Sequence, residues 1–354
     1  MMTILVFELR KIFSKPLVII SLTGILLFSF LISFFTYKDK YAFDEGIGGG
    51  TGKTAVEIDK KIAARYEGIL TDEKVHQMMV HFTPQFNLNG LNAAYVYRNA
   101  MQSAAYARFS DRDGNLNGLK VSDVFGDEEI KIGYVDGWLS TSQNMVKFFV
   151  ALSLVLIIML APVFSAEYEG VDKIILTCKY GKTKCTTAKI VAGILSSVLA
   201  TSLITLFSLL FAFIFYGKEG LDCSILFAPD AYTESFIPFN ITCGTLLKYQ
   251  ILLAFTCALS VTGITLFLSA ISKNQVVAMI ASMTIFLLPA LLPMGENNPL
   301  FLIPIHHVLA FPLLSMKQMQ NGVLYAIWAV PVALIFLGIG ASASRHIFAK
   351  RQVL

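Results

Sequence analysis

One glycine-rich stretch of the chain has the ending of a phosphate-binding loop. Ile47–Thr54 reads IGGGTGKT and closes with the G-K-T of a P-loop. The P-loop pattern needs a glycine five positions before Gly52, where this chain has Ile47, and no apolar strand comes before it. We therefore interpret Gly46–Gly52 as a flexible linker and expect no ATP to bind to this chain through it.

A second stretch has half of a calcium-binding pattern. Asp111, Asp113 and Asn115 follow the D-x-D-x-N spacing of an EF-hand loop. Leu116 stands where that loop requires glycine, and Ser122 stands where it requires a bidentate glutamate. A solvated turn is the better interpretation, and we expect no metal site and no cofactor in this chain.

One pair of cysteines and one pair of histidines are the other side chains that could take part in chemistry. Cys223 and Cys243 lie in a segment that we place outside the cytoplasm, where a disulfide can form, although loop cysteines can also stay unpaired. Adjacent side chains such as His306 and His307 point about 100° apart on a helix, so they do not readily share one ligand. The chain has no HExxH and no Ser-His-Asp spacing, and we expect it not to be an enzyme.

Long runs without Asp, Glu, Lys or Arg form the framework that must hold these side chains in place. The chain is 55% hydrophobic and 15% charged, with a mean hydropathy of +0.66. A helix needs about 20 residues to cross a bilayer, and its backbone groups pair within the helix. The charge-free runs predict six transmembrane helices: Leu17–Tyr37, Phe148–Ala166, Ile190–Tyr216, Tyr249–Ser272, Val276–Met294 and Val323–Ser344.

A further apolar segment, Asn297–Met316, is predicted not to cross the membrane. It contains three prolines and the histidine pair, which suit a bent, re-entrant or interfacial segment. With six spans, the basic segments at both termini, after the second span and at Lys273 fall on one side. The positive-inside rule makes that side the cytoplasm. We expect a bacterial plasma-membrane protein with both termini cytoplasmic.

These elements divide the chain into predicted regions. Residues 1–16 form a cytoplasmic amphipathic helix, 17–37 the first transmembrane helix, 38–144 an extracytoplasmic domain, and 145–354 a five-helix transmembrane region. The last region contains a cytoplasmic loop at 165–189 and outer loops at 217–245 and 295–322. The fold class is an all-α integral membrane protein with a small, mainly helical extracytoplasmic domain.

The extracytoplasmic insert carries 12 Lys and Arg against 15 Asp and Glu. Apolar residues at three- and four-residue steps predict helices within Ala55–Phe82, with Thr71-Asp72 as the start of a second helix. Leu91–Phe109 is predicted to be a third helix, and Val121–Trp138 irregular or weakly extended. The insert has about the smallest size that keeps its own core.

Two cytoplasmic elements carry the functional signal. In Met1–Pro16, Leu5, Leu9 and Ile12 occupy one side of a helix and Glu8, Lys11 and Lys15 another, with Arg10 adding to the basic character, as expected of an interfacial helix. The loop Phe164–Lys189 is longer than a connection requires. Its order of acidic, apolar and basic residues indicates a surface that contacts another protein.

These elements resemble the permease subunits of type-2 ABC exporters, in the subgroup with an extracytoplasmic domain between the first and second spans. In that family the loop after the second span often reads F-x-x-E-x-x-x-G, followed by a short apolar helix and a basic turn. The matching residues here are Phe164, Glu167, Glu169-Gly170, Ile174–Thr177, Tyr180-Gly181-Lys182 and Lys189-Ile190. Gly170 follows Glu167 by only three positions, which departs from the pattern.

The resemblance implies that the loop is a coupling helix for a separate ABC ATPase subunit, which holds ATP and Mg. The contact residues would be Glu167, Glu169, Gly170, Ile174, Ile175, Leu176, Lys179, Tyr180, Gly181 and Lys182. A second permease chain, identical or different, would complete the unit in the lipid bilayer, with no nucleic acid. The translocation path would include Thr201, Thr205, Ser208, Ser260 and Thr265, although such hydroxyls also serve in helix packing.

The function predicted from the sequence is therefore the permease of an ATP-driven exporter for an amphipathic substrate such as a peptide, antibiotic or lipid. Two alternatives stay open. One is a membrane sensor or scaffold with a ligand-binding outer domain, and the other is an ATP-independent secondary transporter. The secondary transporter is disfavoured because no Asp, Glu, Lys, Arg or His lies within a predicted span.

Overall fold

The structure is a computed structural model, and its described residues form two units. The helical unit comprises residues 1–29, 145–207 and 249–354, and the insert unit comprises residues 30–144 and 208–248. The described residues are 1–83, 90–93, 96–168, 177–178, 180–229, 237–295, 298–316, 319–320 and 323–350.

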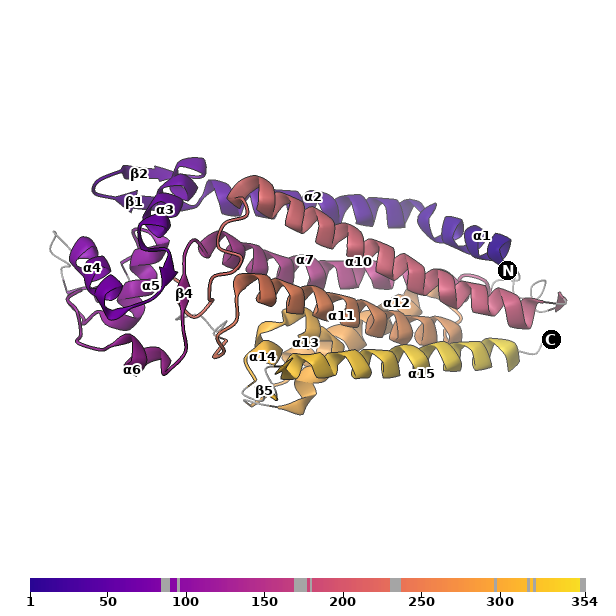
Figure 1. The fold of residues 1–354 in the computed structure, drawn as a ribbon. Helices are drawn as coiled ribbons and strands as arrows, with labels where there is room; N and C mark the ends of the chain where they lie inside the picture. Colours follow the sequence, from indigo (N-terminus) through magenta and orange to yellow (C-terminus); the bar gives the residue numbers. More distant parts are fainter. Residues whose placement is uncertain are drawn as a thin grey trace. The chain divides into compact units, whose positions relative to one another are not determined.

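Long apolar helices dominate the chain (Figure 1). They are α2 (Pro16–Lys38), α7 (Asp136–Leu160), α10 (Thr186–Tyr216), α11 (Cys243–Ile271) and α15 (Ala329–Lys350). Each belongs to a stretch that is long and apolar enough to cross a membrane, which gives five such stretches among the described residues. The protein is therefore a mostly helical, multi-pass membrane protein.

The predicted span at Val276–Met294 corresponds to a shorter helix. Asn274 caps α12 (Gln275–Leu287) by accepting a hydrogen bond from the Val276 N–H, and the 3₁₀ turn η3 (Leu288–Leu291) follows. The apolar helix ends near Pro289 and Pro293, because proline cannot continue the hydrogen-bond ladder. Five stretches in the described part of the chain reach spanning length, so the predicted count of six stays a prediction.

The proline-rich segment is broken into short pieces, as predicted. The order is η4 (Pro299–Leu302), α13 (Pro304–Leu309) and α14 (Phe311–Leu314), followed by β5 (Met319–Gln320). The predicted span Val323–Ser344 begins with β6 (Val323–Leu324) and η5 (Tyr325–Trp328), and its α-helix α15 starts only after them. The β5–β6 pair is antiparallel. Within the described part of this segment no helix is long enough to span a bilayer.

In the helical unit, α11 and α15 lie side by side (Figure 1) and touch through their backbones. A Cβ atom added to Gly263 would lie 2.3 Å from the Phe336 carbonyl oxygen, and one added to Gly340 would lie 2.1 Å from the Gly263 carbonyl oxygen. Small residues permit this approach, which is a common way for helices to pack in bilayers. The two glycines therefore fix the α11–α15 contact.

In its described residues, the insert unit contains four short helices and two small sheets, besides the ends of α2, α7, α10 and α11. Its helices are α3 (Lys53–Tyr66), α4 (Asp72–Phe82), α5 (Ala100–Phe109) and α6 (Val121–Phe125). The antiparallel pairs are β1 (Tyr41–Asp44) with β2 (Gly48–Thr51) and β3 (Gly68–Ile69) with β4 (Lys131–Ile132). Buried side chains, among them Ile62, Met78 and Phe109, form a core. Thr71 caps α4 as predicted, by accepting a hydrogen bond from the Lys74 N–H.

Three predictions for the insert were wrong in detail. The glycine-rich stretch is not a linker: Gly48–Thr51 is a strand, and Gly49 and Gly50 are tight against Phe43 and Thr54. The helix predicted at Leu91–Phe109 begins only at Ala100, where Asn99 caps it. The stretch Val121–Trp138 contains α6, β4 and the start of α7.

Candidate functional site

The N-terminal helix α1 (Met2–Phe13) turns Glu8, which was predicted on its polar side, toward the protein together with Ile12 of its apolar side. A turn at Ser14 separates it from α2, which begins at Pro16, a favourable first position for proline. Glu8 and Ile12 are its buried residues, whereas Phe7 is 64% exposed. The acidic residue thus faces inward. The sequence pattern missed this because the carboxylate has an ionic partner far along the chain.

That partner is Lys189, at the start of α10. Its side chain is 0% exposed, and its ammonium lies 3.0 Å from a Glu8 carboxylate oxygen and 2.5 Å from Oε1 of Glu167. The Lys11 ammonium contacts the same Glu167 oxygen. We call Glu8, Lys11, Glu167 and Lys189 the ion cluster. It joins α1, the start of the 165–189 loop and the end of that loop.

The ion cluster balances two carboxylates against two ammonium groups. Burying a single ion costs several kcal/mol, and removing one partner of a buried pair typically costs about 3–5 kcal/mol because the other charge is left uncompensated. Oε2 of Glu167 is buried and has no hydrogen-bond partner among the described residues. The cluster therefore holds its elements together only while all of its members stay in place.

Hydrogen bonds to α11 fix the position of Glu167. The Ser269 hydroxyl accepts hydrogen bonds from the N–H groups of Phe164 and Ser165, at 2.9 and 3.1 Å, in the short helix α8 (Pro162–Ser165). The same hydroxyl donates to the Ala161 carbonyl. On the other side of Glu167, the Tyr168 hydroxyl donates to the Ala270 carbonyl. The root of the loop is thus anchored to α11 on both sides.

The part of the loop that leads back into α10, residues 180–185, presents a basic, aromatic surface, and we call it the loop's return. Tyr180, Lys182 and Lys184 are exposed, and the Lys184 ammonium lies 4.1 Å from the centre of the Tyr180 ring, within range of a cation–π interaction. A π-helical turn, η2 (Gly181–Cys185), leads from there into α10. Such turns often occur at functional positions.

The structure brings together only some of the predicted site residues. Glu8, Lys11 and Glu167 meet in the ion cluster, and Tyr180, Gly181 and Lys182 lie at the loop's return, where Gly181 is buried. Arg10 is exposed. Lys189 matches the family pattern in the sequence, but no contact was predicted for it. Six predicted contact residues lie outside the described part of the chain: Glu169, Gly170, Ile174, Ile175, Leu176 and Lys179.

The hydroxyl residues of the predicted translocation path are buried. Thr201, Thr205, Ser208, Ser260 and Thr265 all have little exposure. Thr201 and Ser260 donate to carbonyls one turn earlier in their own helices. Their burial within one chain fits the packing alternative, and their role in transport stays a prediction.

The two histidines have different environments. His307 is enclosed by α11 and the chain before α13: Nδ1 lies 3.1 Å from the Thr256 hydroxyl, and Nε2 lies 2.8 Å from the Leu302 carbonyl oxygen. His306 packs edge-on against Phe301, and its two ring nitrogens have no hydrogen-bond partner among the described residues. His307 is therefore occupied by structural hydrogen bonds.

Cys223 and Cys243 are neighbours across an antiparallel bridge. The Cys243 N–H donates to the Cys223 carbonyl at 3.0 Å, and Ser224 pairs with Thr242. Both thiols are buried and free in this structure, and burial raises the pKa of Cys223 to about 11. The residues are adjacent as a disulfide requires, and the bond itself stays a prediction.

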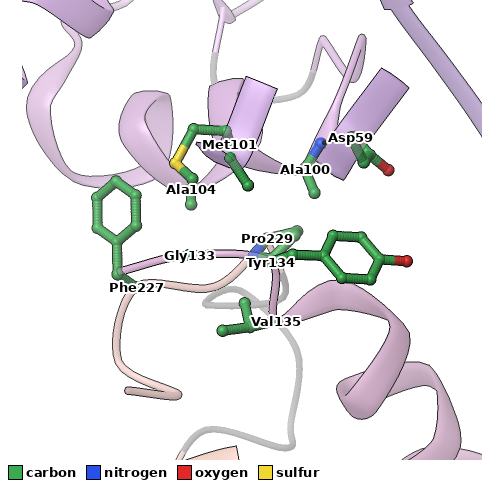
Figure 2. A pocket seen from close by; sticks show the side chains of 10 residues that line it. Asp59, Ala100, Met101, Ala104, Gly133, Tyr134, Val135, Phe227 and Pro229 are labelled. Carbon is green, nitrogen blue, oxygen red and sulfur yellow. Dashed lines mark hydrogen bonds between the residues drawn. The ribbon is translucent and has the colours of Figure 1, made fainter. Parts of the chain in front are cut away.

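A small pocket in the insert unit is lined by α3, α5 and the chain around Gly133 (Figure 2). Met101, Ala104 and Phe227 gather at one end of the view and Asp59 at the other. The cavity measures about 10 Å³, the space of about one water molecule. This pocket is therefore too small for an organic ligand of the kind that a sensor domain would bind.

Asp59 is nevertheless an unusual residue of this pocket. It is buried, its Oδ1 accepts a hydrogen bond from the Ala100 N–H, and its Oδ2 has no hydrogen-bond partner among the described residues. Burial raises the pKa of Asp59 to about 6, against smaller lowering effects of the Ala100 N–H and of Lys40. This carboxyl titrates near neutral pH.

Comparison with known proteins gives no independent indication of what the site does. No family model, no curated protein and no solved structure matches this chain. The functional argument therefore depends on the ion cluster and the loop that it anchors.

Proposed function

We propose that this chain is the membrane-spanning permease subunit of an ATP-driven exporter, and that its 165–189 loop binds a separate ATPase subunit. The observation that carries the proposal is the ion cluster. It ties the two ends of one loop to each other and to α1, through a lysine with no exposed surface.

A loop that only connects two helices does not need such an anchor. A loop that transmits force does, because movement at its tip has to reach the membrane helices without being absorbed at its root. The ion cluster and the Ser269 and Tyr168 hydrogen bonds make the root rigid. A displacement of the loop near Tyr180 would then move α10, α11 and α1 together as a rigid body.

The charge of the loop's return suits an acidic partner surface. Lys182 and Lys184 are exposed and lie beside an exposed tyrosine. Aromatic and basic side chains are effective contact residues, and opposite charges on two partners guide their association. The proposal includes ATP and Mg on the partner, a second permease chain, an amphipathic substrate and a cytoplasmic position of the loop.

Co-purification from native membranes tests the proposal. The tagged full chain is expected to retain a protein that binds and hydrolyses ATP. The Lys182→Glu, Lys184→Glu double variant is expected to weaken that association about tenfold, because each exposed ion pair contributes up to about 1 kcal/mol. Lys53→Glu, at an exposed position in the insert unit, is the matched control and should not change it.

Two outcomes would reject the proposal. One is the absence of any ATP-hydrolysing partner in the purified complex. The other is an unchanged association in the double variant. Solute-dependent proton flux by the purified chain alone would instead support a secondary transporter.

A further inference from the structure

One cavity in the helical unit lies where α1 passes into α2. It has a volume of about 230 Å³ and is lined by the ends of three helices: the start of α2, the end of α7 and the start of α12. Leu17, Val18, Ile158, Val276 and Met279 make most of its wall apolar. An enclosed apolar cavity of about 150 Å³ already binds a small hydrophobic molecule, and this cavity is larger and partly open.

One charged residue lines this apolar cavity. The Lys15 side chain is half-buried, and its ammonium makes neither a hydrogen bond nor an ion pair with any described residue. Glu8 and Glu167 of the neighbouring ion cluster attract Lys15 from a distance, but their ion pairs are with Lys11 and Lys189. Burial, followed by repulsion from Lys11 and Lys189, lowers the pKa of Lys15 to about 8, against smaller raising effects of Glu167 and Glu8. A half-buried ammonium without a counter-ion is costly.

The position of Lys15 indicates which counter-ion is at hand. It precedes Pro16, the first residue of the membrane-spanning helix α2, so it lies at the depth of lipid head groups. The apolar wall begins with the next residues of that helix and continues on α12, where Val276 is exposed. Charge at one end and apolar surface at the other match an amphipathic molecule with a negative head.

We propose that this cavity binds one anionic phospholipid, with its phosphate at the Lys15 ammonium and an acyl chain against Val18, Ile158 and Met279. The bound lipid would supply the missing negative charge and fill the apolar space between α2, α7 and α12. This proposal does not depend on the ATPase partner, since every residue of the site belongs to the helical unit of this chain.

Native mass spectrometry of the full chain tests the site. The chain is reconstituted in vesicles of phosphatidylcholine with one-tenth phosphatidylglycerol, extracted in mild detergent, and examined for retained lipid. The wild-type chain is expected to retain one phosphatidylglycerol in preference to phosphatidylcholine. Lys15→Ala should reduce this occupancy about fivefold, the effect of one basic residue near a charged surface. Lys15→Arg should preserve most of it.

A second pair of variants tests whether an acyl chain occupies the apolar part of the cavity. Met279→Trp fills the cavity and should also lower retention of phosphatidylglycerol, whereas Ile280→Trp adds the same bulk at an exposed position one residue further along α12 and should not. Lys182→Ala controls for loss of a positive charge elsewhere. Thermal unfolding of every variant verifies that it is folded.

Three results would overturn the proposal. Equal retention of phosphatidylcholine would show that the head-group charge is not recognised. Unchanged occupancy in a folded Lys15→Ala variant would show that the phosphate binds elsewhere. Unchanged occupancy in a folded Met279→Trp variant would show that no acyl chain enters the cavity.

Discussion

The Lys189 ammonium and the Glu8 carboxylate lie 3.0 Å apart in the protein interior, although 181 residues separate them in the sequence. Glu167 completes the contact from the other end of the loop that Lys189 closes. The pair therefore connects the first helix of the chain to the loop and to α10 at a single point. Removal of the Lys189 ammonium from this contact is therefore expected to change the stability of the protein.

Lys189→Met is expected to lower the unfolding midpoint of the full chain strongly, because it leaves Glu8 and Glu167 buried without their shared cation. The expected cost is about 3–5 kcal/mol. The triple variant Glu8→Gln, Glu167→Gln, Lys189→Met removes both stranded carboxylates and should regain much of the loss. Thermal unfolding in detergent measures both, with the exposed Lys182→Met as control. A Lys189→Met midpoint equal to that of the control would contradict the role of the cluster.

The native cysteines allow a test of membrane orientation. Cys178 is exposed, Cys185 is half-buried, and the other three cysteines are buried. In a Cys185→Ser background, a membrane-impermeant maleimide should label Cys178 in inverted membrane vesicles and not in intact cells. Lys53→Cys, in the insert unit, should show the opposite pattern. Labelling of Cys178 in intact cells would reverse the orientation and reject the proposed contact with an ATPase.

Asp59 predicts a pH dependence in the insert unit. Its folded pKa of about 6 lies above the ordinary value of 3.8, so folding favours the protonated carboxyl. Its contribution to stability is fully present below about pH 4 and is lost as the pH rises through 6. The loss amounts to about 3 kcal/mol at pH 8, an order-of-magnitude figure.

Asp59→Asn should remove most of this dependence and make the insert unit more resistant to denaturant at pH 8. Hydrogen exchange of the α3 and α5 amides in the full chain, at pH 4.5 and at pH 8, measures the stability of the insert unit at each pH. Glu73→Gln changes an exposed carboxylate on α4 and is the control. A pH dependence that is the same in the Asp59→Asn chain would contradict the assignment.

The α11–α15 contact predicts a large difference between two glycines of one helix. Gly340→Ala should lower the unfolding midpoint, because the added Cβ would lie 2.1 Å from the Gly263 carbonyl oxygen and the helices would have to separate. Gly338→Ala is the matched control, since a Cβ there meets nothing within 4 Å and alanine favours a helix. Equal midpoints for the two variants would show that the contact contributes little.

Local patterns predicted the elements whose causes are local. Charge-free runs located α2 and α10 closely, and α11 and α15 less closely, because composition over about 20 residues decides where a helix can span but not where it ends. Thr71 and the prolines around α13 were also correctly interpreted, since a cap or a missing N–H acts on its own turn.

Features that depend on distant partners could not be predicted in this way. The Gly48–Thr51 strand exists because Tyr41–Asp44 pairs with it. The inward orientation of Glu8 exists because Lys189 lies opposite, so helical periodicity alone assigned Glu8 to the polar face. One signal in the sequence was available. Glu167 directly follows one predicted span and Lys189 directly precedes the next, and a charged residue at the edge of an apolar run needs an ionic partner.

The ion cluster also sets an order of events during synthesis. Glu8 emerges 181 residues before Lys189, which at about 5–20 residues per second is a delay of about 10–40 s. During that interval a solvated carboxylate is more stable than a buried one without a cation. We expect α1 to stay at the membrane surface until α10 has been inserted, so that the first helix to be made is among the last to reach its final place.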